Sequence, residues 1–131
     1  MDHVAPSAED IERLARAALD ALPEAFRPAA RQVALRVDEF APDWMLSEMA
    51  IEDPFELTGL YDGIPMTEKS VGDPPHGPDT VWLFRRPILD EWADRGDVTL
   101  GALVAHVLVH ELAHHFGWSD ADIATIDRWW E

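Results

Sequence analysis

Residues 110–120 read HELAHHFGWSD and place three histidines, one glutamate and one aspartate in an otherwise apolar segment. His110 and His114 are four residues apart, so on a helix their imidazoles project from the same side, one turn apart. At this spacing two ring nitrogens can reach one metal ion. Glu111 lies beside them, within reach of a water at the metal but displaced from the ligand direction. The order H-E-x-x-H therefore predicts two zinc ligands, His110 and His114, and a general base, Glu111.

A third protein ligand is needed, because catalytic zinc usually has three protein ligands and one open position. Gly117 permits a left-handed turn that can bring Asp120 to face the two histidines. Asp120 is thus the candidate third ligand, although the segment SDADI also suits a helix start, in which Asp120 would be an N-cap. The Gly–Asp extension makes a chance match far rarer than H-E-x-x-H alone. An Asp ligand favours Zn²⁺ but leaves manganese, cobalt and nickel as alternatives.

Other residues near the motif allow alternative interpretations. The histidines and Glu111 could instead form a buried polar cluster satisfied within the protein. His106 makes a second pair with His110, but no glutamate follows it, and we expect a packed or supporting histidine. His115 points away from the ligand pair and is expected to be exposed or hydrogen-bonded elsewhere. Tyr61, the only tyrosine, could stabilise the oxyanion that develops on an attacked carbonyl, or could pack a loop onto the core.

The motif requires a helix, and residues 100–116 are apolar on nearly every face, as expected for a buried central helix. Thr99 or Asp97 can cap its start, and Gly117 can end it. Periodicity and turn residues predict further helices over 7–22, 43–50, 88–94 and 120–130, and strands over 33–37, 60–64 and 80–84. The elements together indicate a mixed fold of the α+β class.

Composition limits the class of protein. A chain of 131 residues is most simply one domain, 1–131. Its net charge of -16 repels phosphate and anionic lipid, so we expect neither nucleic acid nor membrane as a partner. Without cysteine, any metal must be held by His, Asp, Glu or backbone oxygen. The acidic N-terminus lacks the apolar core of a secretory signal, and we expect a cytoplasmic protein.

The motif has the form H-E-x-x-H-x-x-G-x-x-D, a metzincin-type extension with Asp in the last position. In this motif, in LTGLYDGIPMTEKS and in VWLFRRPIL, the chain resembles the minimal zincins, a small bacterial family of zinc metallopeptidases. The likeness runs from about residue 22 to the C-terminus. It implies that His110, His114 and Asp120 bind the metal and that Glu111 is the catalytic base.

The resemblance also implies a fold and a function. The expected fold is a reduced zincin of the α+β class, with a small twisted β-sheet packed against the buried motif helix and with flanking helices. In larger zincins an edge strand above the metal binds an extended peptide by strand addition, and TVWLF at 80–84 is expected to serve as that strand. The expected activity is zinc-dependent hydrolysis of short or unfolded peptides, with a metal-activated water as the nucleophile.

One departure from larger metzincins favours a different function. Those enzymes place a methionine turn beneath the metal after the motif, whereas all four methionines of this chain precede the motif helix. The alternative is a non-catalytic metal-binding module with a structural or regulatory role. Glu111 favours the peptidase, because a purely structural site needs no base.

Overall fold

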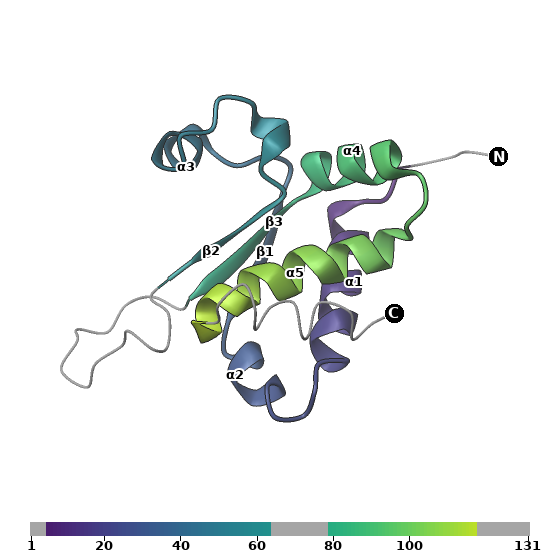
Figure 1. Ribbon diagram of the computed structural model, residues 1–131, viewed down its shortest axis with the longest axis vertical. Helices are drawn as coiled ribbons and strands as arrows, with labels where there is room; N and C mark the ends of the chain where they lie inside the picture. The colour runs from purple at the N-terminus through teal and green to yellow at the C-terminus, as the bar shows by residue number, and fades with distance from the viewer. Residues whose placement is uncertain (1–4, 64–78, 118–131) are drawn as a thin grey trace.

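The computed structural model describes residues 5–63 and 79–117 (Figure 1). The elements of these residues are, in order, α1 Ala8–Asp20, α2 Arg27–Arg31, β1 Ala34–Asp38, α3 Asp43–Glu48, the 3₁₀ helix η1 Pro54–Glu56, β2 Gly59–Asp62, β3 Thr80–Phe84, α4 Arg85–Arg95 and α5 Leu100–Phe116. The described part of the chain thus combines helices with a small three-stranded sheet, which confirms the predicted α+β class. The predicted helix over 120–130, and Asp120 with it, lie outside the described residues.

The sheet has the strand order β1-β3-β2, with β1 parallel and β2 antiparallel to β3. The prediction that residues 80–84 form an edge strand is therefore wrong, since β3 is paired on both sides. Apolar and aromatic residues on both faces of TVWLF suit a strand that is covered on both faces, which is the environment of a central strand. The edge strand nearest the motif helix is β2, which packs on α5 (Figure 1).

Alternation along β3 divides the apolar side chains between the two faces of the sheet. Val81 and Leu83 join the main core, to which α1 and α5 contribute most of the buried residues. Phe84 and the partly buried Trp82 belong to a second cluster with residues of α3. The main core thus lies on the face that carries the motif helix, and it fixes that helix relative to β2 and β3.

Local signals fix the two ends of α5. The Thr99 hydroxyl accepts a hydrogen bond from the N–H of Ala102 at 3.1 Å, so Thr99 and not Asp97 is the N-cap. At the other end Gly117 has φ 72° and ψ 28°, and its N–H donates to the carbonyl of His114 at 3.1 Å. This left-handed glycine confirms the predicted end of the helix.

The body of α5 is buried between α1 and the sheet, as predicted from its all-round apolar character. Val104 and Leu108 are at most 1% exposed, and burial of each such side chain contributes about 1.5–3 kcal/mol. A helix anchored in this way can hold functional side chains on its remaining face. No helix in the described ranges is both long and apolar enough to cross a membrane.

Candidate metal centre and active site

Two parallel rows of side chains run along α5 in steps of four residues. Val107, Glu111 and His115 form the row nearer the sheet, since Val107 lies under Gly59 of β2 and His115 contacts Tyr61. The row next to it is made of histidines alone, His106, His110 and His114. The ring centroids of His110 and His114 are 5.6 Å apart. The helix therefore brings Glu111 beside this histidine pair, as the motif predicts.

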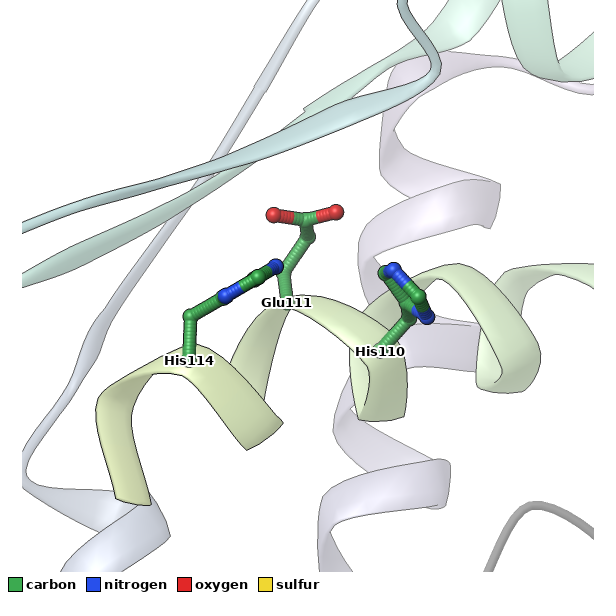
Figure 2. Close-up of side chains that lie close together, drawn as sticks. All are labelled: His110, Glu111 and His114. Carbon is green, nitrogen blue, oxygen red and sulfur yellow. The ribbon is translucent and has the colours of Figure 1, made fainter. Parts of the chain in front are cut away.

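His110, Glu111 and His114 form a compact group of potential metal ligands. One ligand atom from each residue can be chosen so that all lie within 4.8 Å of one another. Figure 2 shows the Glu111 carboxylate pointing toward the strands, with one imidazole on either side. The two imidazoles suit zinc and similar divalent metals, so the histidine pair fits the metal that the sequence predicts, with Glu111 beside it in the place of the predicted base.

The Glu111 carboxylate is anchored to the sheet edge. Its Oε1 accepts a hydrogen bond from the backbone N–H of Tyr61 in β2 at 3.0 Å. Burial raises the pKa of the Glu111 carboxyl above its ordinary value, while the neighbouring His114 and His110 act in the opposite direction, as does the Tyr61 N–H. A carboxylate with a raised pKa and a fixed orientation is suited to accept a proton from water.

The close approach of β2 to α5 depends on Gly59. A Cβ atom at this position would lie 2.7 Å from Cγ1 of Val107, 3.0 Å from the carbonyl oxygen of Trp82 and 3.4 Å from Cγ of Glu111. Only glycine lets the strand lie this near the helix. This contact keeps the Tyr61 N–H within hydrogen-bonding distance of Glu111.

The Tyr61 side chain lies over the last turn of α5. Its hydroxyl donates to Oδ2 of Asp79 at 2.9 Å and lies 3.4 Å from Nδ1 of His115. Burial and the hydrogen bond to Asp79 raise the pKa of the Tyr61 phenol above its ordinary value. In this arrangement the donor of the phenol is engaged, so an oxyanion role would require it to exchange Asp79 for substrate.

His115 was predicted to be either exposed or hydrogen-bonded away from the ligand pair. It is buried, and its Nδ1 lies 3.0 Å from Oδ2 of Asp79. The second alternative, a polar partner away from the ligand pair, is therefore confirmed. Asp79 was not singled out by the sequence, because an aspartate just before a strand has no distinctive pattern. The four-residue row through Glu111 was the one available signal that His115 faces the sheet.

A hollow of about 150 Å³ opens beside His110. It lies between the residue preceding β2, the end of α4 and the middle of α5, and it is lined by Thr58, Glu91, Arg95, His106, Val107, His110 and Glu111. His106 therefore faces this hollow and stands outside the group of His110, Glu111 and His114 within the described part of the chain. Its packed or supporting role stays a prediction.

The geometry of a paired-histidine helix beside a sheet edge can be compared with known families. The sequence model of the family described as Zincin-like metallopeptidase matches residues 30–130 of this chain. The chain belongs to the zincin-like metallopeptidase family. The match covers all three strands of the sheet and the whole motif helix, and of the helices and strands of this zincin only α1 and most of α2 precede it. A comparison with curated proteins gave no match.

Proposed function

We propose that this zincin is a zinc-dependent metallopeptidase that hydrolyses short or unfolded peptides. The observation that carries the proposal is the anchoring of Glu111 to the Tyr61 N–H beside the histidine pair. A site that only stored a metal would gain nothing from a carboxylate held ready beside the ligands. Family membership supports the same activity.

His110 and His114 would hold the metal, with Asp120 as the proposed third ligand. The left-handed Gly117, three residues before Asp120, is the turn that this arrangement needs. Without cysteine, this donor set favours zinc and allows manganese, cobalt or nickel. When bound, the metal supplies Lewis acidity for the scissile carbonyl and for the attacking water.

Glu111 would act first as the general base and then as the general acid. Its carboxylate accepts the proton of the attacking water and passes it to the nitrogen of the leaving amine, so that the peptide bond is replaced by a carboxyl and an amine. The Tyr61 N–H holds one carboxylate oxygen, Oε1, which leaves Oε2 to face the water. For Tyr61 itself, oxyanion stabilisation is the role to be tested.

The peptide would lie along the edge of β2 that faces away from β3, which no other strand of residues 5–63 and 79–117 covers. The N–H of Phe84 donates to the carbonyl of Thr58 at 2.9 Å, and bonding in an antiparallel pair alternates from residue to residue. Gly59 and Tyr61 therefore turn their backbone groups away from β3. Because Glu111 accepts the N–H of Tyr61, the groups that would bond a peptide here are the carbonyl of Tyr61 and the N–H and carbonyl of Gly59. Strand addition here would carry an extended peptide past the histidine pair.

Zinc content and peptide cleavage of Glu111→Gln beside wild type test the proposal. The amide keeps the shape and the acceptor oxygen but cannot take a proton. We expect the variant to retain zinc and to lose cleavage of a peptide library read by mass spectrometry. Cleavage that survives the change would exclude Glu111 as base. Wild-type protein that holds zinc but cleaves no peptide would support the non-catalytic metal-binding module.

A further inference from the structure

A buried polar cluster lies behind the candidate metal centre, at the last turn of α5. It consists of Tyr61 in β2, Asp79, which directly precedes β3, and His115 in α5. Oδ2 of Asp79 lies 2.9 Å from the Tyr61 hydroxyl and 3.0 Å from Nδ1 of His115. One carboxylate oxygen thus joins two strands of the sheet to the end of the motif helix.

Burial makes this cluster depend on its internal contacts. Asp79 is 8% exposed and His115 is 4% exposed. Polar groups at such depth are costly unless they are hydrogen-bonded, so the loss of one contact within the cluster should be costly. The three side chains are therefore strongly held in one relative position.

Asp79 is fixed from two further directions. Its backbone carbonyl accepts a hydrogen bond from the N–H of Ala34 at the start of β1, at 2.8 Å. Gly63 lies against its carboxylate, since a Cβ atom at Gly63 would be 2.5 Å from Oδ1 of Asp79 and 2.8 Å from the Tyr61 hydroxyl. The carboxylate is thus held on the sheet, and His115 docks onto it.

The last turn of a helix needs such an anchor. Its carbonyls lack the onward bonds of the helix interior, so helix ends open more readily than helix centres. The two histidines of the motif differ in this respect, since His110 lies in the body of α5 whereas His114 is in its last turn. His115 follows His114 directly and is the side chain that binds this turn to the sheet.

We propose that Tyr61, Asp79 and His115 form a positioning network that fixes the last turn of α5 against the sheet and thereby places His114 for metal binding. In this role the three residues would act by positioning His114 and not as metal ligands themselves. This inference rests on the metal-binding part of the proposed function but not on catalysis. Groups that orient metal ligands in this indirect way typically change metal affinity about 10–100-fold when they are removed.

Two variants disturb the network in different ways. Asp79→Ala removes the shared acceptor, whereas Gly63→Ala keeps every polar group and displaces the Asp79 carboxylate by steric contact. Gly101→Ala is the matched control, since a Cβ atom there would meet, among the described residues, only Cδ2 of Leu14, at an ordinary 3.5 Å. If Asp79→Ala does not fold, Gly63→Ala still tests whether the network affects zinc affinity.

Two measurements decide the proposal. Zinc affinity is measured by competition with a chromophoric chelator, and amide hydrogen exchange is measured in the metal-free protein. We expect both network variants to bind zinc about 10–100-fold more weakly than wild type. We also expect faster exchange in residues 112–116, with residues 102–106 unchanged. Gly101→Ala should match wild type in both measurements.

The outcomes separate this inference from the proposed function. Unchanged zinc affinity in a folded network variant, or an exchange rate that rises equally along all of α5, would overturn the network. If wild-type protein binds no zinc, the metal-binding part of the proposed function fails on its own, and the link from the network to His114 as ligand fails with it. If zinc binds but no peptide is cleaved, the network stands and only the catalytic proposal is lost.

Discussion

The backbone N–H of Tyr61 donates to Oε1 of Glu111 at 3.0 Å, and this bond joins the edge strand β2 to the motif helix. It makes the orientation of the candidate base a property of the strand as well as of the helix. A change that moves β2 should therefore affect Glu111 even when no residue of the motif is altered.

Gly59→Ala tests this dependence. The added methyl group would lie 2.7 Å from Cγ1 of Val107 and must push the strand away from α5. We expect the free energy of unfolding to fall by about 1–3 kcal/mol and peptide cleavage to fall about tenfold or more, because Glu111 loses its orientation. Chemical denaturation and a cleavage assay on the folded protein measure the two effects. Full activity in folded Gly59→Ala would contradict the dependence, and Gly101→Ala is the control.

Tyr61→Phe separates two roles of the phenol while leaving the backbone bond to Glu111 in place. Because the hydroxyl is already bonded to Asp79, we expect a loss of about 1–3 kcal/mol in unfolding free energy. We expect kcat to stay within about tenfold of wild type. A fall in kcat of about 10²–10³-fold with zinc affinity unchanged would instead assign the hydroxyl to oxyanion stabilisation.

Alkaline titration should reveal the surroundings of Tyr61. Burial and the Asp79 hydrogen bond raise the pKa of its phenol in the folded protein, whereas an unfolded tyrosine ionises near pH 10. Above about pH 10 the folded state therefore binds more protons than the unfolded state, and the unfolding free energy falls as pH rises. The stabilisation is fully present below about pH 10 and is lost as the pH rises through the folded pKa.

This titration can be measured directly, since the chain has a single tyrosine. Phenolate absorbance is followed against pH in native buffer and in denaturant. The native curve should lie at clearly higher pH than the denatured one. Coincident curves would show that the phenol is neither buried nor bonded to Asp79.

Asp120→Ala distinguishes a metal ligand from a helix cap. If Asp120 is the third ligand, as proposed, zinc affinity should fall by orders of magnitude, because a two-histidine site is incomplete. If it only caps a helix, zinc should be retained and stability should fall by about 0.5–2 kcal/mol. Metal analysis after dialysis and chemical denaturation measure the two quantities. Asp94→Ala, at an exposed position of α4, is the control.

Zinc should stabilise the folded protein by mass action. At a free zinc concentration about 100 times Kd, the gain in unfolding free energy is about 2.7 kcal/mol if the unfolded chain does not bind zinc. Addition of a chelator should reverse the gain, and calorimetry with and without metal measures it. His110→Ala should show no such gain, and a gain equal to that of wild type would place the zinc elsewhere.

Much of the candidate site could be predicted because its signals are local. The four-residue step between His110 and His114 fixes a shared helix side whatever the fold. The cap at Thr99 and the left-handed Gly117 likewise depend on residues within a few positions of the helix ends. The family resemblance predicted the α+β class, and the match over residues 30–130 confirms the family.

The wrong prediction of an edge strand and the omission of Asp79 both concern residues whose surroundings come from distant segments of the chain. Residues 80–84 were correctly predicted to be a strand, but their place in the sheet depends on β1 and β2, which lie far along the chain. Strand propensity does not specify neighbours, so the choice of edge strand was wrong. Asp79 was missed for the same reason, since its significance comes entirely from side chains that the fold brings to it.

By itself, then, the sequence determined which residues of α5 could bind a metal and which could act on water, because helical periodicity is a short-range property. The tertiary structure decided which strand passes Glu111, and that Tyr61 supplies the N–H that holds it. It also decided that His115 is buried against Asp79. The physical reason is that hydrogen bonds between distant segments form only when the packing of α5 against the sheet brings their partners within about 3 Å.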